Sequence, residues 1–288
     1  MHIEFTKMHG LGNDFIVIDN REESLDLSEG AVEYLCDRHF GIGADGLMLL
    51  RPASSPDADF AWWFRNSDGS IAEMCGNGIR CMAKFIADNG LVTADTDSVR
   101  IETLTGVRPI TFTRDQNGRL DTATVDMGEP ILDPPAIPTT FDGSMVFECP
   151  IDTDFGTFRV TAVSMGNPHA VIWVDDVEEA PVDTVGPLIE THPAFPKKTN
   201  VEFAQLMGDG TIRVRVWERG VGETLACGTG ACATLVAATL ACHVGREATI
   251  ELDGGELHVR WDADEHVYMT GPAVTVFTGT FEVGEEGE

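Results

Sequence analysis

Two cysteines precede glycine turns in similar phrases that lie far apart in the chain. Cys75 stands before Gly-Asn-Gly in "MCGNGIRC", and Cys227 stands before Gly-Thr-Gly in "LACGTGACA". Each phrase runs into a helix-like segment, so each thiol is expected at a helix start, where unpaired N–H groups and a partial positive charge favour anions. Glycine lets a ligand approach the backbone closely, and a thiol in this position is expected to have a lowered pKa.

The two phrases together predict a particular chemistry. Two such turns acting on one substrate would hold a carboxylate between two sets of N–H groups, with a sulfur on either side. A thiolate can then remove a proton from one face of an α-carbon while a thiol delivers a proton to the opposite face. The outcome is inversion of a stereocentre. One phrase alone would favour a tight turn with a buried thiol, so the hypothesis depends on the pair.

A lone nucleophilic cysteine would normally need a histidine base. The chain offers three candidates, but their spacing in the sequence does not show which of them lies near a cysteine: His9, His39 and His169. A metal centre is not predicted, because the number of cysteines is odd and no C-x-x-C occurs. Four other cysteines are expected in the core because they lie in helix-like patterns: Cys36, Cys81, Cys232 and Cys242. Cys149 lies in an apolar, strand-like phrase.

The pattern of apolar residues predicts two similar α/β halves, each with many strands and a central helix that begins at a cysteine. Helices are expected over 28–39, from Cys75 to 89, and over 182–192 and 229–242. Strands are expected over 3–10, 14–19, 46–51, 59–66, 99–115, 120–128, 145–149, 156–164, 169–174, 200–207, 211–217, 247–252, 255–261 and 265–270. The segment "AVTVFTGTFEV" is expected to return to the first half.

These elements predict a domain division. The first half comprises residues 1–128 together with 272–284, and the second half comprises residues 139–271. The proline-rich passage "EPILDPPAIP", residues 129–138, is the expected linker.

Composition narrows the setting. The 288 residues include 48 acidic and 19 basic side chains, for a formal net charge of −29. The electric field of this negative charge repels nucleic acid and anionic membranes, so neither is an expected partner. The acid is spread along the chain, which favours a solvated surface suited to high salt. No signal peptide and no membrane span are predicted, so a cytoplasmic protein is expected.

Six blocks of sequence resemble the diaminopimelate epimerase family: "MHGLGNDF", "FGIGADG", "RNSDGSIAEMCGNGIRC", "GNPH", "NVEF" and "ERGVGETLACGTGACA". They occur in order between residue 5 and about residue 275. The resemblance implies two pseudo-symmetric α/β domains, each a strand barrel around a central helix, with the active site in the cleft between them. It also implies cofactor-free interconversion of LL- and meso-diaminopimelate in lysine biosynthesis, and a homodimer is a possible assembly.

The resemblance also implies roles for individual residues. Cys75 and Cys227 correspond to the two acid/base residues, and His169 and Glu218 to positions that support them. Backbone N–H groups for the reacting carboxylate would come from Gly76, Asn77, Gly228 and Thr229. The other expected substrate-binding residues are Asn13, Asn66, Asn167, Asn200, Glu218 and Arg219.

Other functions remain open from the sequence. Proline and hydroxyproline racemases share the fold and the C-G-x-G turns, and an epimerase of another amino acid, such as histidine, is an alternative. A catalytically silent amino-acid-binding protein would need neither cysteine. A pyridoxal enzyme is less favoured, because none of the four lysines lies in a recognisable cofactor context.

Overall fold

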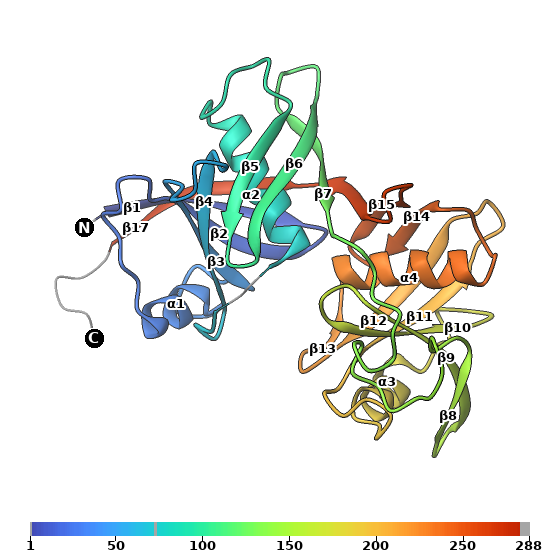
Figure 1. Ribbon diagram of the computed structural model, residues 1–288. Coiled ribbons are helices and arrows are strands. Elements are labelled where there is room, and N and C mark those ends of the chain that lie inside the picture. Colours follow the sequence, from blue (N-terminus) through green and yellow to red (C-terminus); the bar gives the residue numbers. More distant parts are fainter. Residues whose placement is uncertain (1, 72–73, 283–288) are drawn as a thin grey trace. The chain divides into compact units, whose positions relative to one another are not determined.

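The computed structural model describes residues 2–71 and 74–282. The chain divides into two compact units (Figure 1): unit 1 comprises Met1–Val125 and Gly271–Glu288, and unit 2 comprises Asp126–Thr270. The chain therefore passes from one unit to the other twice. Residues 283 and 284 of the predicted first half, and the acidic tail beyond Glu282, lie outside the described residues.

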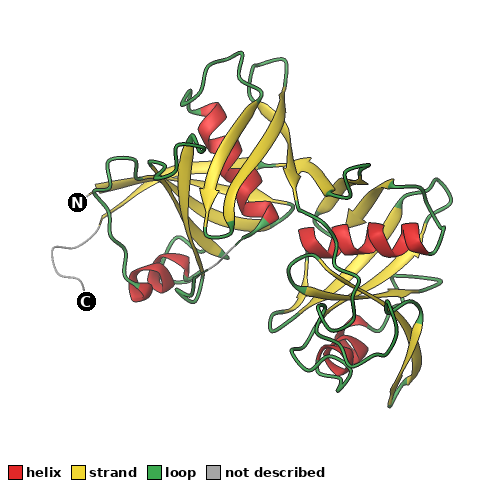
Figure 2. Cartoon of the chain, in the orientation of Figure 1, coloured by secondary structure: helices red, strands yellow, loops and turns green. Residues whose placement is uncertain are grey.

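In its described residues, unit 1 is built on one run of strands with two helices, drawn in yellow and red in Figure 2. Its elements are β1 (His2–Gly10), β2 (Asn13–Asp19), α1 (Glu29–Cys36), β3 (Gly46–Arg51), β4 (Phe60–Asn66), α2 (Gly76–Asp88), β5 (Ser98–Thr103), β6 (Gly106–Arg114), β7 (Leu120–Asp126) and β17 (Val274–Glu282). Neighbouring strands follow the order β17-β1-β2-β3-β4-β5-β6-β7. The pairs β2–β3 and β4–β5 are parallel, and the others are antiparallel.

Unit 2 has the same plan. Its elements are β8 (Cys149–Thr153), β9 (Gly156–Ser164), β10 (Pro168–Trp173), α3 (Val182–Glu190), β11 (Asn200–Leu206), β12 (Ile212–Glu218), β13 (Gly222–Thr224), α4 (Gly228–Leu240), β14 (Glu247–Leu252), β15 (Gly255–Trp261) and β16 (Val267–Pro272). The order is β8-β9-β10-β11-β12-β14-β15-β16, with β10–β11 and β12–β14 parallel. β13 adds to β12 as a short antiparallel strand.

The two units share one arrangement of parallel strand pairs and helices. Each has a parallel pair joined through a peripheral helix, α1 or α3, and a second parallel pair joined through a central helix, α2 or α4. This repetition confirms the expected α/β fold of two pseudo-symmetric halves. The return of the last strand is also confirmed, because β17 pairs with β1.

The central helices are buried over most of their length. α2 contacts β1, β2 and β3, and α4 contacts β9, β10, β11, β14 and β15. The residues of α2 from Gly76 to Ala87 are all buried. α4 is apolar nearly all round, as the sequence predicted, and its residues are buried from Gly228 to Ala238 except Thr229. Burial on all sides holds the first turn of each helix in a defined position.

Several predicted boundaries were wrong, each for a local reason. The strand expected over 145–149 begins only at Cys149, because Glu148 has a left-handed φ of 46°. The strand expected from 265 begins at Val267, because Glu265 has a φ of 67°. The helix expected over 28–39 ends at Cys36, because the Asp37 carboxylate accepts the backbone N–H groups of His39 and Phe40. α3 ends at Glu190 and α4 at Leu240, each two residues before its predicted end.

One expected core cysteine is not in the core. Cys242 is exposed, because it follows the end of α4 with a left-handed φ of 58°. Cys36, Cys81 and Cys232 are buried, which confirms the prediction for them. Within the described ranges, none of the helices is both long and apolar enough to cross a membrane.

Candidate active site

Cys75 is the N-cap residue of α2. Its backbone is extended, with φ −143° and ψ 115°, and its sulfur accepts the N–H of Gly78 at 3.4 Å. The sulfur also lies 3.6 Å from Oδ1 of Asn13, to which the thiol can donate. The glycine turn therefore places the sulfur beside the free N–H groups of the first helical turn, as the sequence predicted.

A buried arginine supports this turn from inside. Arg80 is fully buried, and its guanidinium donates to the carbonyl of Gly76 at 3.1 Å and to Oδ1 of Asn77 at 2.9 Å. Nδ2 of Asn77 in turn donates to Oδ1 of Asn13 at 3.2 Å. We call Cys75, Asn13, Asn77 and Arg80 the Cys75 site. Arg80 lies within the phrase "CGNGIRC", but its type and spacing alone did not single it out.

A charge network anchors Asn13. Its Nδ2 donates to Asp45 at 2.9 Å, and Arg38 bridges Asp45 and Asp14 at 2.8 and 2.7 Å. Burial would raise the pKa of the Asp14 carboxyl, but hydrogen bonds from Arg38 and Lys7 outweigh it and hold this pKa well below its usual range. Asn13 is therefore held from one side by fixed charges and faces the Cys75 sulfur from the other.

Asn66 stands apart from the Cys75 site in its contacts. It is exposed at the end of β4, and its Nδ2 donates to the hydroxyl of Ser70 at 2.9 Å. Its backbone N–H donates to the carbonyl of Ser70, which closes the turn "NSDGS". The contacts described for Asn66 are those of a turn residue, and its substrate-binding role stays a prediction.

Cys227 repeats the geometry of Cys75. It is the N-cap of α4, with φ −122° and ψ 109°, and its sulfur accepts the N–H of Gly230 at 3.4 Å. The hydroxyl of Thr229 lies 3.5 Å from the same sulfur. Both thiols thus cap a buried central helix in the same way, at equivalent places of two repeated units.

The expectation of a lowered thiol pKa is wrong for Cys227. Burial raises its pKa well above the ordinary value, and the negative charges of Glu218 and Glu202 raise it further. Hydrogen bonds from Thr229 and Gly230 act in the opposite direction but are weaker. The helix start favours a thiolate, but the carboxylates on β11 and β12 and the lack of water outweigh it. Cys227 therefore carries its proton in the substrate-free protein at neutral pH.

A line of side chains leads from Cys227 to a buried acid. Nδ2 of Asn167 donates to the Thr229 hydroxyl at 3.3 Å, and Oδ1 of Asn167 lies 3.1 Å from Nε2 of His169. Nδ1 of His169 lies 2.6 Å from Oε1 of Glu202, and both of these side chains are fully buried. We call Cys227, Thr229, Asn167, His169 and Glu202 the Cys227 site. Glu202 lies within the block "NVEF" but was not predicted as a site residue.

The same cluster has donor atoms that could bind a metal ion. Ligand atoms of His169, Glu202 and Cys227 lie within 4.8 Å of one another. However, the 2.6 Å contact already pairs the imidazole with the carboxylate. We therefore interpret the cluster as a hydrogen-bonded network of side chains.

Asn200 and Arg219 lie together at the ends of neighbouring strands. Nδ2 of Asn200 donates to the carbonyl of Pro168, and its Oδ1 accepts the backbone N–H of Arg219, both at 2.9 Å. Arg219 is exposed, and its guanidinium donates to the carbonyl of Lys197 at 3.3 Å. The amide of Asn200 is therefore used by the backbone, where it positions the residue that carries the guanidinium.

Glu218 ends β12, next to Arg219 in the chain. Its Oε1 accepts the hydroxyl of Thr224 at 2.6 Å, which ties it to β13. Through its charge it also acts on the Cys227 thiol.

The effect of the Glu218 charge on the Cys227 thiol can be tested by the pH dependence of alkylation. We expect iodoacetamide to alkylate Cys227 slowly near neutral pH, with a rate still rising above pH 9, because the reagent attacks the thiolate and the pKa is raised. Glu218→Gln removes a negative charge and should move this profile to lower pH. Peptide mass spectrometry measures the rate, with exposed Cys242 as internal reference. An unshifted profile would mean that Glu218 has no electrostatic effect on Cys227.

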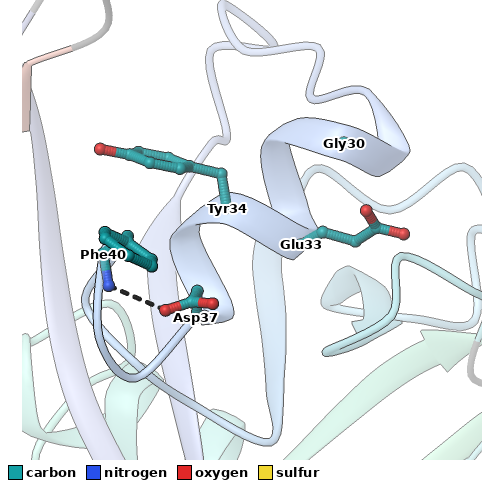
Figure 3. Close-up of a pocket in the computed structure, with 5 residues that line it drawn as sticks. All are labelled: Gly30, Glu33, Tyr34, Asp37 and Phe40. Atoms are coloured by element: carbon teal, nitrogen blue, oxygen red, sulfur yellow. Dashed lines mark hydrogen bonds between the residues drawn. The ribbon is translucent and has the colours of Figure 1, made fainter.

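A separate hollow lies on α1. It has a volume of about 460 Å³ and is lined by Gly30, Glu33, Tyr34, Asp37 and Phe40 (Figure 3). The Phe40 N–H donates to the Asp37 carboxylate at 2.8 Å, and the Phe40 ring is 80% exposed. None of the predicted site residues lines this hollow, so we do not assign the reaction to it.

Comparison with known proteins was made for the sequence and for the fold. The family model described as diaminopimelate epimerase matches residues 5–132 and 161–276. A diaminopimelate epimerase of Pelotomaculum thermopropionicum is 51% identical over 281 residues, which cover 97% of this chain and 99% of that protein. A diaminopimelate epimerase of Methanococcus maripaludis strain C5 is 49% identical, with 98% and 100% covered.

Solved structures with the same fold are more distant in sequence. A hydroxyproline epimerase from Agrobacterium vitis superposes with a TM-score of 0.69 at 17% identity, covering 97% of this chain and 92% of that one. A PhzF-family phenazine biosynthesis protein from Bacillus anthracis gives a TM-score of 0.70 at 16% identity, with 98% and 100% covered. At such identities the likeness shows the fold alone.

Proposed function

Because the chain belongs to the diaminopimelate epimerase family, we propose that it interconverts LL- and meso-diaminopimelate in lysine biosynthesis, without a cofactor. The observation that carries this proposal is the pair of N-cap cysteines at equivalent helix starts of two repeated units. The relatives that are 51% and 49% identical over nearly their whole length are diaminopimelate epimerases, which supports diaminopimelate as the substrate.

The reaction follows from the two thiols. One sulfur, as thiolate, takes the proton from the α-carbon, so the C–H bond breaks and an S–H bond forms. The electron pair delocalises into the α-carboxylate. The other thiol then gives its proton to the opposite face of the α-carbon and becomes the thiolate. Atoms and charge balance, the stereocentre is inverted, and the two sulfurs have exchanged roles.

The helix starts stabilise the charge that develops. We propose that the free N–H groups of Gly76 and Asn77, and of Gly228 and Thr229, bind the reacting carboxylate. Backbone N–H groups at a helix N-terminus favour a carboxylate, and favour it more as negative charge builds up during proton removal. The buried central helices keep these donors in place before the substrate arrives.

The raised pKa of Cys227 supports a proposal about the roles of the two thiols before substrate binds. We propose that the Cys75 thiolate begins turnover, because the raised pKa keeps Cys227 in its thiol form. Cys227 is then the acid in the first direction, and after turnover it must hold a thiolate. Its neighbours must therefore tolerate both states.

The decisive experiment is an isotope assay. The protein is incubated with LL-diaminopimelate in heavy water, and NMR follows α-deuterium incorporation and the meso product. Proline and histidine are the control substrates, because hydroxyproline epimerase and proline racemase structures share this fold. Turnover of proline in place of diaminopimelate would contradict the proposal.

A distal carboxylate on the substrate is expected to contact Arg219. A charge-assisted hydrogen bond of this kind contributes about 1.5–3 kcal/mol. Arg219→Ala should therefore lower kcat/KM for diaminopimelate about tenfold or more. Arg260→Ala, which removes another exposed arginine of unit 2, is the matched control and should leave kcat/KM unchanged. Unchanged kinetics in Arg219→Ala would remove Arg219 from the distal subsite.

We further propose that the enzyme works in a salt-rich cytoplasm. The formal charge of −29 implies self-repulsion that ions screen, so stability should rise with KCl. The measurement is the melting temperature from dilute buffer to molar KCl, and a flat or falling series would rule this out.

We also propose that the protein assembles as a homodimer. Light scattering in the same buffers measures the molecular mass, and the mass of a single chain would contradict this proposal.

A further inference from the structure

The Cys227 site holds a carboxylate that the reaction does not use directly. Glu202 is fully buried on β11, and its Oε2 has no hydrogen-bond partner among the described residues. Its other oxygen, Oε1, lies 2.6 Å from Nδ1 of the equally buried His169. A buried carboxylate is costly unless a positive or hydrogen-donating group compensates it. The imidazole is the compensating group that the structure provides.

The two ring nitrogens of His169 have different oxygen neighbours. Its two ring nitrogens face two oxygen acceptors, Oε1 of Glu202 and Oδ1 of Asn167 at 3.1 Å. A ring nitrogen can bond to an oxygen acceptor only by donating. With the Asn167 amide in this orientation, a ring that carries hydrogen on both nitrogens donates to both oxygens, and its charge balances the Glu202 carboxylate.

The protonated ring sets the direction of the following hydrogen bonds. Because Oδ1 of Asn167 accepts from His169, Nδ2 of the same amide points to the Thr229 hydroxyl and donates to it at 3.3 Å. The Thr229 oxygen is then an acceptor, and its own hydrogen is free to be donated to the Cys227 sulfur at 3.5 Å. Each hydrogen bond from His169 onward thus donates toward the sulfur.

We propose that Glu202 is a positioning residue for Cys227: it holds His169 as the protonated start of a donor chain through Asn167 and Thr229 that ends at the sulfur. This inference rests on the proposed function, in which Cys227 must hold a thiolate once per cycle. Burial and the charges of Glu218 and Glu202 work against that thiolate. A protonated His169 offsets the charge of Glu202, and the chain gives the sulfur a second donor beside the N–H of Gly230. Without the carboxylate the ring loses its counter-charge, and the Asn167 amide can turn and draw the Thr229 hydrogen away.

The first test measures protonation without substrate. In protein labelled with ¹⁵N-histidine, both ring nitrogens of His169 should carry hydrogen in the unchanged protein at pH 8. In Glu202→Gln, one nitrogen should be unprotonated. A neutral His169 ring in the unchanged protein would overturn the proposal. This readout does not depend on diaminopimelate, so it remains decisive even if the proposed substrate is wrong.

The second test measures coupling. Glu202→Gln and Thr229→Val should each lower kcat about tenfold or more, and Glu202→Gln should change KM less than about twofold. Because both changes interrupt one chain, the double variant should be no slower than the slower single variant. Losses that multiply in the double variant, or an unchanged kcat in Glu202→Gln, would contradict the proposal.

A matched control separates this effect from general damage. Thr161 is a buried threonine of β9 in the same unit, and its hydroxyl accepts the N–H of Glu148 outside the chain described above. Thr161→Val is the same isosteric change as Thr229→Val and should retain kcat. Melting temperatures of all variants show whether each protein is folded, and a loss of kcat in Thr161→Val equal to that in Thr229→Val would overturn the assigned chain.

Discussion

Cys75→Ser and Cys227→Ser are each expected to lower kcat for epimerisation about a thousandfold or more, within the range that a positioned acid or base contributes. A serine hydroxyl is a far weaker acid than a thiol, so it cannot hold the anionic state that each sulfur must adopt once per cycle. Since every turnover uses one residue as base and the other as acid, the two losses should be similar in both directions of the reaction.

The measurement is the coupled formation of meso product and α-deuterium in heavy water. Cys242→Ser is the matched control, because Cys242 is exposed and outside both sites. It should retain full activity. If either active-site variant keeps more than a tenth of the activity, its sulfur is not one of the two proton carriers.

Gly230→Ala is expected to lower kcat/KM about a hundredfold, because a misplacement of about 1 Å at a reacting group can cost that much. An added Cβ would stand 2.7 Å from Oε1 of Glu202 and 3.3 Å from the Cys227 sulfur. Either the carboxylate or the sulfur must move. Alanine favours a helix more than glycine does, so loss of helix propensity cannot explain a fall in activity.

The control for this change is Gly245→Ala. Gly245 has no neighbour within 4 Å of an added Cβ and does not adopt a left-handed φ. It should leave kcat/KM and the melting temperature nearly unchanged. Full activity in Gly230→Ala would show that the space between Glu202 and Cys227 tolerates a methyl group, and would weaken the assigned role of both side chains.

The sequence by itself determined the elements that depend on neighbours in the chain. A glycine follows Cys75 and Cys227 at the start of each central helix, and the apolar residues that follow continue as buried helices. The order of strands and helices likewise predicted two repeated halves, because period and turn residues are local signals. The six sequence blocks were specific enough to identify the family, because they occur in order along nearly the whole chain.

Only the tertiary structure decided the electrostatics of the two sites. A helix start by itself predicts a lowered thiol pKa, but the fold brings Glu202 of β11 and Glu218 of β12 near Cys227 and removes water from it. Arg80 likewise lies in a recognised phrase, yet only its burial shows that it supports the first turn of α2. The physical reason is that Coulomb interactions and desolvation depend on distance and burial in three dimensions, which spacing along the chain does not specify.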